Sequence, residues 1–65
     1  MANTRLIFVV HAFYKGVYCG AANANGICDA IRTAMQLKEC GYCYELALYE
    51  CVGLGCICNG VICNG

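Results

Sequence analysis

Cysteine is the residue type best able to do chemistry in this chain, with eight among 65 residues. Thiols either pair as disulfides or bind soft metal ions. At this density, a short chain is typical of a disulfide scaffold, so we predict that every cysteine is bonded. The set consists of Cys19, Cys28, Cys40, Cys43, Cys51, Cys56, Cys58 and Cys63. Eight cysteines allow on the order of a hundred pairings, so their number alone leaves the connectivity open.

The segment 56–63 predicts the direction in which three of these cysteine side chains point. Asn59–Gly60 is a strong short signal for a two-residue turn, because both central residues of that turn need positive φ. With the turn there, Cys56 faces Cys63. Side chains alternate along a strand, so Cys56, Cys58 and Cys63 share one face. We therefore predict a C-terminal β-hairpin over 56–63 whose sulfurs find partners elsewhere in the chain.

A metal centre is the chemical alternative to disulfides. Cys40-x2-Cys43 and Cys56-x-Cys58 together offer four thiolates, as many as tetrahedral zinc or an iron–sulfur cluster takes. This spacing is less specific than two C-x2-C knuckles, and it leaves four cysteines unused. We keep the cysteine-based site as an alternative and predict that the protein holds no metal and no cofactor.

The chain offers little for catalysis. His11 is the only histidine, and serine is absent. A lone histidine in an apolar strand is usually a satisfied core residue, and no paired carboxylates or phosphate-binding loop accompany it. We therefore predict no enzyme activity.

Charge and hydropathy limit the partners. Four basic and four acidic residues give zero net charge, which argues against nucleic acid and against a cationic membrane-attacking peptide. No apolar run approaches the ~18–20 residues of a transmembrane helix. The chain is 62% hydrophobic, which is more than so small a volume can bury. Exposed apolar surface indicates a protein target, self-association or contact with a lipid surface.

The first half of the chain predicts a strand, a loop and a helix. Residues 5–14 are continuously apolar and rich in β-branched and aromatic types, which predicts a strand covered on both faces. Segment 20–26 predicts a loop. From about 26 to 39 the period becomes helical. The apolar stripe of this central helix consists of Ile27, Ala30, Ile31, Ala34 and Met35.

The second half is harder to assign. Tyr42, Leu46 and Tyr49 fall on one helical face, so the sequence allows a second helical segment over 42–52, apolar nearly all round. The predicted fold class is then small, disulfide-rich α+β. It has an N-terminal strand, a central helix and a C-terminal hairpin, within one disulfide-stabilised domain over 1–65.

The cysteine spacing of residues 40–63 resembles that of the cystine-knot miniproteins, the knottins and cyclotides. The pattern is Cys40, Cys43, Cys51-x4-Cys56-x-Cys58-x4-Cys63. In those families a C-x-C hairpin supplies the last three cysteines. The resemblance implies the pairs Cys40–Cys56, Cys43–Cys58 and Cys51–Cys63, with Cys19–Cys28 as an extra clamp.

The strand–helix–hairpin order is also similar to the cysteine-stabilised αβ scaffold of defensins and scorpion toxins. The helix of that family carries C-x3-C, whereas Cys40 and Cys43 here are C-x2-C. Both resemblances imply a secreted, rigid, non-enzymatic scaffold.

Cysteine content also predicts the compartment. Disulfides persist in oxidising surroundings, so we expect a secreted, extracellular protein. Residues 5–10 resemble the start of a signal peptide, and 20–22 resemble its cleavage site. However, His11 and Lys15 interrupt the apolar run, so we expect 1–22 to be retained.

These observations predict a small secreted protein that binds a protein or membrane-protein target, as toxins, inhibitors and defence peptides do. Tyrosine is favoured at interfaces, and a rigid surface loses less entropy on binding. The predicted binding surface consists of Tyr42, Tyr44, Glu45, Tyr49 and Glu50. The alternative is a self-assembling structural subunit of an oligomer, coat or filament, because zero net charge and a long apolar strand favour association.

Overall fold

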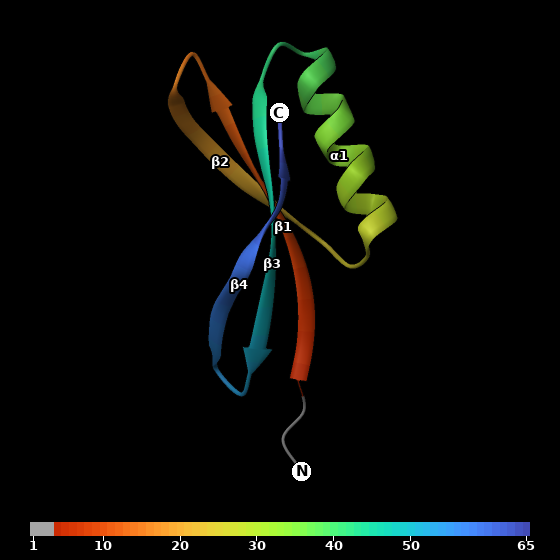
Figure 1. Ribbon diagram of the computed structural model, residues 1–65, viewed down its shortest axis with the longest axis vertical. Coiled ribbons are helices and arrows are strands. Elements are labelled where there is room, and N and C mark those ends of the chain that lie inside the picture. Colours follow the sequence, from red (N-terminus) through yellow and green to blue (C-terminus); the bar gives the residue numbers. More distant parts are fainter. Residues whose placement is uncertain (1–3) are drawn as a thin grey trace.

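The computed structural model describes residues 4–65 as a four-stranded antiparallel sheet with one helix against it (Figure 1). The elements are β1 (Thr4–Tyr14), β2 (Val17–Ala24), α1 (Ile27–Glu39), β3 (Cys43–Val52) and β4 (Gly55–Asn64). The strands lie in the order β2-β1-β3-β4. The predicted α+β fold, with one N-terminal strand and a separate C-terminal hairpin, is therefore wrong, because the sheet takes up most of the chain.

Tight two-residue turns close both hairpins. Between β1 and β2, Lys15 has φ 51° and Gly16 has φ 81°, the positive values of a type I′ turn. Between β3 and β4, Gly53 has φ 62° and Leu54 completes the turn, as in type II′. Turns of these types match the right-handed twist of the strands that they join.

The turn predicted at Asn59–Gly60 is wrong, because β4 runs straight through it. Two shifts in the register with β3 leave Asn59 and Ile62 as extra, unpaired residues, which are β-bulges. Gly60 has a positive φ of 131°, a backbone conformation that glycine adopts easily and that accommodates the bulge beside it. The turn at Gly53 lies earlier in the chain and lets β4 pair with the ten-residue strand β3. A hairpin closed at Asn59–Gly60 would form only a few residue pairs, so the longer β3–β4 hairpin forms instead.

The helix allowed over 42–52 is also wrong, because this segment forms β3. Tyr44, Leu46 and Leu48 alternate with residues that face the other side of the sheet. The predicted helix over 26–39 is present as α1, and the strand predicted over 5–14 is present as β1. The loop predicted over 20–26 is mostly wrong, because residues up to Ala24 continue β2.

The core lies between α1 and the upper half of the sheet. Val10 and Leu46 are each 1% exposed and are paired neighbours on β1 and β3. They pack with Ala24, Ala30 and Ala34, whose small side chains let the helix approach the sheet closely. Phe8, Leu37 and Tyr44 surround this cluster. Only one face of β1 is covered by the helix, which corrects the prediction that both are.

The apolar stripe predicted for the helix is only partly buried. Ile27, Ile31 and Met35 are 41%, 47% and 59% exposed. The reason is geometric: one short helix on a sheet buries a narrow stripe, which here is centred on Ala30 and Ala34.

The helix also covers only part of the sheet along its length. The molecule measures 43 × 22 × 15 Å, whereas a helix of 13 residues is roughly 20 Å long. Within residues 4–65, α1 contacts β1, β2 and β3 but makes no contact with β4. The start of β1, the end of β3 and the start of β4 therefore extend beyond the helix (Figure 1).

Candidate functional site

A row of polar and aromatic side chains crosses the sheet face that the helix does not cover. Nδ1 of His11 lies 3.3 Å from the hydroxyl of Tyr18, and its Nε2 lies 3.4 Å from the hydroxyl of Tyr49. Phe13 packs edge-on against Tyr18, with ring centroids 5.5 Å apart. On β4, Cys58 lies opposite Tyr49. We call Tyr18, His11, Tyr49 and Cys58 the open-face row.

The neighbours of Tyr49 change its acidity. Loss of hydration raises the pKa of its phenol, and Cys58 raises this pKa further through the repulsion between a thiolate and a phenolate and through a hydrogen bond. The charges of Glu45 and Tyr18 act in the same direction. Tyr49 therefore stays protonated over a wider pH range than a free tyrosine. His11, predicted to be a core residue, is partly exposed on this face and hydrogen-bonded at both ring nitrogens.

One disulfide is formed in the described part of the chain, between Cys51 and Cys56. These residues are direct partners on β3 and β4, with Cα atoms 4.0 Å apart. The bond therefore links neighbouring strands of one hairpin, beside its turn. It differs from the pairing that the cystine-knot resemblance implies, in which Cys51 bonds Cys63. The remaining cysteines are free and exposed in the structure: Cys19, Cys28, Cys40, Cys43, Cys58 and Cys63. Their bonding stays a prediction.

The structure does not gather the cysteines considered for a metal centre. Cys43 begins β3, whereas Cys56 lies opposite Cys51 near the other end of that strand. Among residues 4–65, no three histidine, cysteine or acidic side chains are grouped closely enough to hold a metal ion. The described residues form no pocket either, so the open-face row lies on an open surface.

The predicted binding residues are spread over the molecule. Tyr44 packs against the core on the helix side, and the alternation of β3 places Glu50 on that side too. Glu45 and Tyr49 lie on the opposite face. Tyr42, which precedes β3, packs against a tyrosine ring of β1 with centroids 5.3 Å apart. The five residues thus form no single patch, and their role in binding stays a prediction.

Strand β4 is the feature that sequence reasoning missed. It is an edge strand of the sheet, and all ten of its residues are exposed. Its largest apolar side chains, Ile57, Val61 and Ile62, are 70%, 50% and 47% exposed. The available signal was the absence of charge from Cys51 to Gly65. It was hidden by the expected Asn59–Gly60 turn, which would have paired the two halves of this segment with each other.

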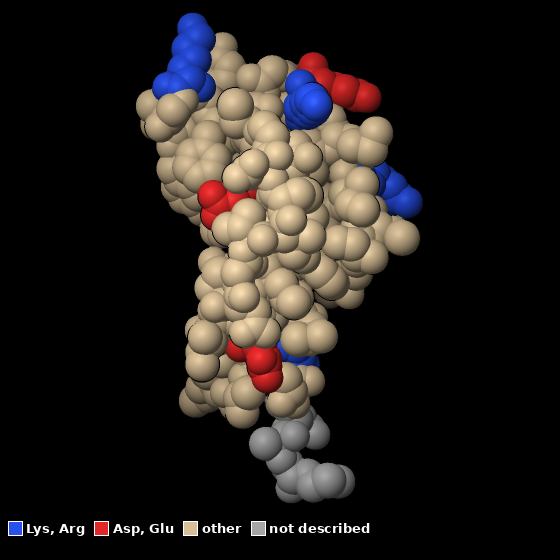
Figure 2. Space-filling model, viewed as in Figure 1, with Lys and Arg blue, Asp and Glu red and all other residues tan. Residues whose placement is uncertain are grey.

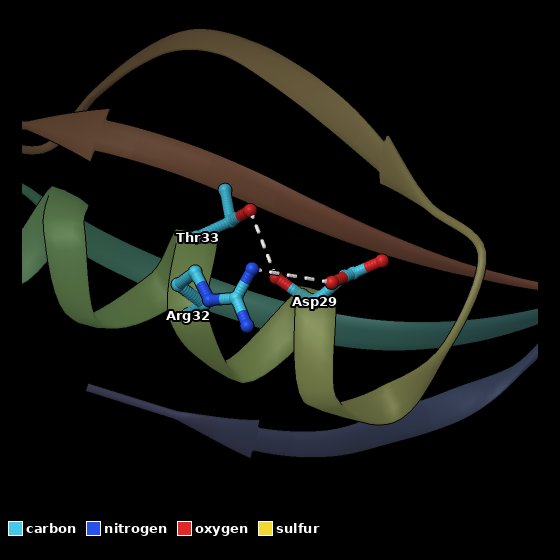
Figure 3. Close-up of polar contacts among 3 residues, drawn as sticks. All are labelled: Asp29, Arg32 and Thr33. Atoms are coloured by element: carbon cyan, nitrogen blue, oxygen red, sulfur yellow. Dashed lines mark hydrogen bonds and ion pairs between the residues drawn. The ribbon is translucent and has the colours of Figure 1, made fainter.

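Charged groups are unevenly spread over the surface. On the face that Figure 2 shows, they are scattered over the upper half and appear again near the lower end, with an uncharged band between. On α1, Arg32 and Asp29 form an exposed ion pair at 3.6 Å, and the Thr33 hydroxyl donates to the Asp29 carbonyl at 3.0 Å (Figure 3). Exposed pairs of this kind contribute little to stability, so this flank of the helix is a solvated surface.

Among the described residues, no helix combines the length and the apolar character needed to cross a membrane. Comparison with protein-family models, with curated proteins and with solved structures finds no match. The fold defines two candidate surfaces, the open-face row and the β4 edge, against which α1 does not pack as it does against the β2 edge.

Proposed function

We propose that this protein is a non-enzymatic structural subunit that associates with further copies of itself through the β4 edge of its sheet. The observation that carries the proposal is β4, an edge strand of ten exposed residues without a charge. An edge strand presents unpaired backbone N–H and C=O groups, which can pair with another strand. Natural proteins block such edges with lysine, proline or bulges. Here the bulges at Asn59 and Ile62 are the only such device on β4.

The rest of the surface supports the same function. Twelve large apolar side chains are exposed among the described residues, although a small monomeric protein usually keeps such patches small. Zero net charge means that two copies do not repel each other as they approach. Association hides this surface without requiring a partner of different composition.

Sedimentation velocity and light scattering across micromolar concentrations test this proposal. We expect species larger than the 7.0 kDa chain, with and without reductant, so that intermolecular disulfides are not the cause. Val61→Lys places a charge on β4 and should return the protein to a monomer. Val17→Lys is the matched control, because Val17 is 65% exposed on the other edge strand, β2. A monomer at every concentration would contradict the proposal.

The second candidate is a small secreted binding protein of the toxin, inhibitor or defence-peptide kind. The same β4 edge favours it, because a sheet edge can accept an extended segment of a different protein. The Cys51–Cys56 bond fits an oxidising compartment. A chain that stays monomeric but binds extended peptides, and loses them in Val61→Lys, would favour this candidate over self-assembly.

A further inference from the structure

The part of the sheet beyond the helix carries an uncovered patch on the helix side. Leu6, Glu50 and Ile57 lie in one row across β1, β3 and β4. Leu6 is 56% and Ile57 is 70% exposed. Val52, two residues after Glu50 on the same side, is 46% exposed. We call these four residues the bare patch. Its one carboxylate, that of Glu50, accepts a hydrogen bond from the Asn59 side chain at 3.2 Å and is otherwise flanked by the apolar side chains of the patch.

The helix carries an uncovered ridge of its own, made by Ile27, Ile31 and Met35. Their spacing of four residues places them on one flank. Figure 3 shows Thr33 on the flank that faces β1 and β2. Ile31 and Met35 each lie two residues from Thr33, which is about 200° around a helix. The ridge therefore lies on the opposite flank, which faces β4. Lys38 lies on the same flank because it follows Ile31 by seven residues, which is about two helical turns.

A two-fold axis brings these two surfaces together. If two copies pair their β4 strands antiparallel, the axis is perpendicular to the joined sheet, and both helices stay on the same side of it. The rotation turns the second copy end over end. Its bare patch then lies beside β4 of the first copy, level with the helix, on the flank that the ridge faces. The uncovered half of one sheet is thereby placed against the helix of the other copy.

We propose that two copies of this chain form a symmetric dimer through antiparallel β4 strands, in which the ridge and Lys38 of each copy cover the bare patch of the other. This inference rests on the proposed self-association and names its geometry. Because of the two-fold axis, the contact between ridge and bare patch forms twice, and the bare patch of each copy is covered by the ridge of the other. A standard interface buries about 800 Å² per partner, a modest share of the 4637 Å² surface.

Charge complementarity favours a second copy as the occupant. Glu50 is the charge in the bare patch, and Lys38 is the charge beside the ridge. Within one copy they cannot meet: Lys38 lies near the end of α1 that leads into β3, whereas Glu50 is seven residues further along β3 than Cys43. At about 3.3 Å per residue, that is roughly 23 Å along the strand. Between two copies related by the axis, the pair forms twice.

A zero-length carbodiimide cross-linker tests this contact directly. Light and isotopically heavy chains are mixed before cross-linking and digestion. We expect a Lys38–Glu50 linked peptide that contains one light and one heavy half. Its absence from a sample that sedimentation shows to be associated would overturn the proposed dimer. The proposal that the chain self-associates would then still stand, whereas a monomer at every concentration would overturn both.

Charge reversal provides the second test. Lys38→Glu and Glu50→Lys should each weaken dimerisation by about tenfold or more, because like charges then face each other. The double variant should recover most of the loss. Lys15→Glu, at the β1–β2 turn and away from β4, is the matched control and should leave dimerisation unchanged. Circular dichroism checks that each variant keeps its fold. Equal dimerisation of all four variants would overturn the inference.

Discussion

At the scale of single residues, Tyr49 is the side chain whose acidity the fold clearly changes. Its hydroxyl lies 3.4 Å from His11 Nε2, and dehydration together with Cys58 raises its pKa above the ordinary 10.0. Folding thus favours the protonated phenol. This preference contributes to the free energy of unfolding, and the contribution is fully present below about pH 10. It is lost as the pH rises through the raised pKa of Tyr49, because the phenol of the unfolded chain releases its proton at a lower pH than the phenol of the folded chain.

The raised pKa of Tyr49 predicts a late component in the ionisation of the tyrosines. In a titration followed by phenolate absorbance, Tyr49→Phe should remove a component whose pKa lies above the ordinary value of tyrosine. Tyr14→Phe is the control, since Tyr14 is 44% exposed and lies at the end of β1; it should remove absorbance but leave that component. The stability of the wild type should also fall more steeply above pH 10 than that of Tyr49→Phe. Titration curves of the same shape for both variants would contradict the contact.

At the scale of elements, the turns decide which strands meet. Lys15 has φ 51° although it is not glycine, and this left-handed conformation costs an ordinary residue roughly 1–2 kcal/mol. Asparagine tolerates it better and is preferred in type I′ turns. Lys15→Asn should therefore raise the free energy of unfolding by about 0.5–1 kcal/mol, measured by urea denaturation. Lys15→Ala removes the same charge without relieving the backbone and should give no gain. Equal effects of both substitutions would refute the turn argument.

The elements also show where sequence reasoning succeeds. The strand over 5–14 could be predicted from its run of β-branched and aromatic residues, and the helix over 26–39 from its one clear period. Residues 42–52 satisfy both periods, since Tyr42, Leu46 and Tyr49 fit a helical face while Leu46 and Leu48 also alternate along a strand. Pairing with β1 on one side and β4 on the other decides between them, and that information is not local.

The candidate site depended on similar non-local choices. Asn59–Gly60 is the stronger turn signal, yet the Gly53 turn gives β3 and β4 their full length. That choice sets Cys51 opposite Cys56 and Tyr49 opposite Cys58. Once the turn is misplaced, the disulfide partner, the open-face row and the β4 edge are all misassigned. The composition did predict correctly that much apolar surface stays exposed, because that conclusion needs no register.

At the scale of the whole molecule, one face of the sheet and part of the other lack a covering layer, so a single copy has a small core for its length. A domain of about 60 residues buries only about 60% of its unfolded surface and is marginal alone. Assembly through β4 would supply the missing burial, and folding would then be coupled to association.

This coupling predicts that stability depends on concentration. If folded copies dimerise and unfolded chains do not, each tenfold increase in protein concentration stabilises the folded dimer by about 1.4 kcal/mol. The urea midpoint of the wild type should therefore rise from low to high micromolar concentration. Val61→Lys, which charges β4, should unfold at one midpoint throughout, whereas Val17→Lys on β2 should behave like the wild type. Midpoints that do not move with wild-type concentration would show that one copy is stable without its bare patch covered.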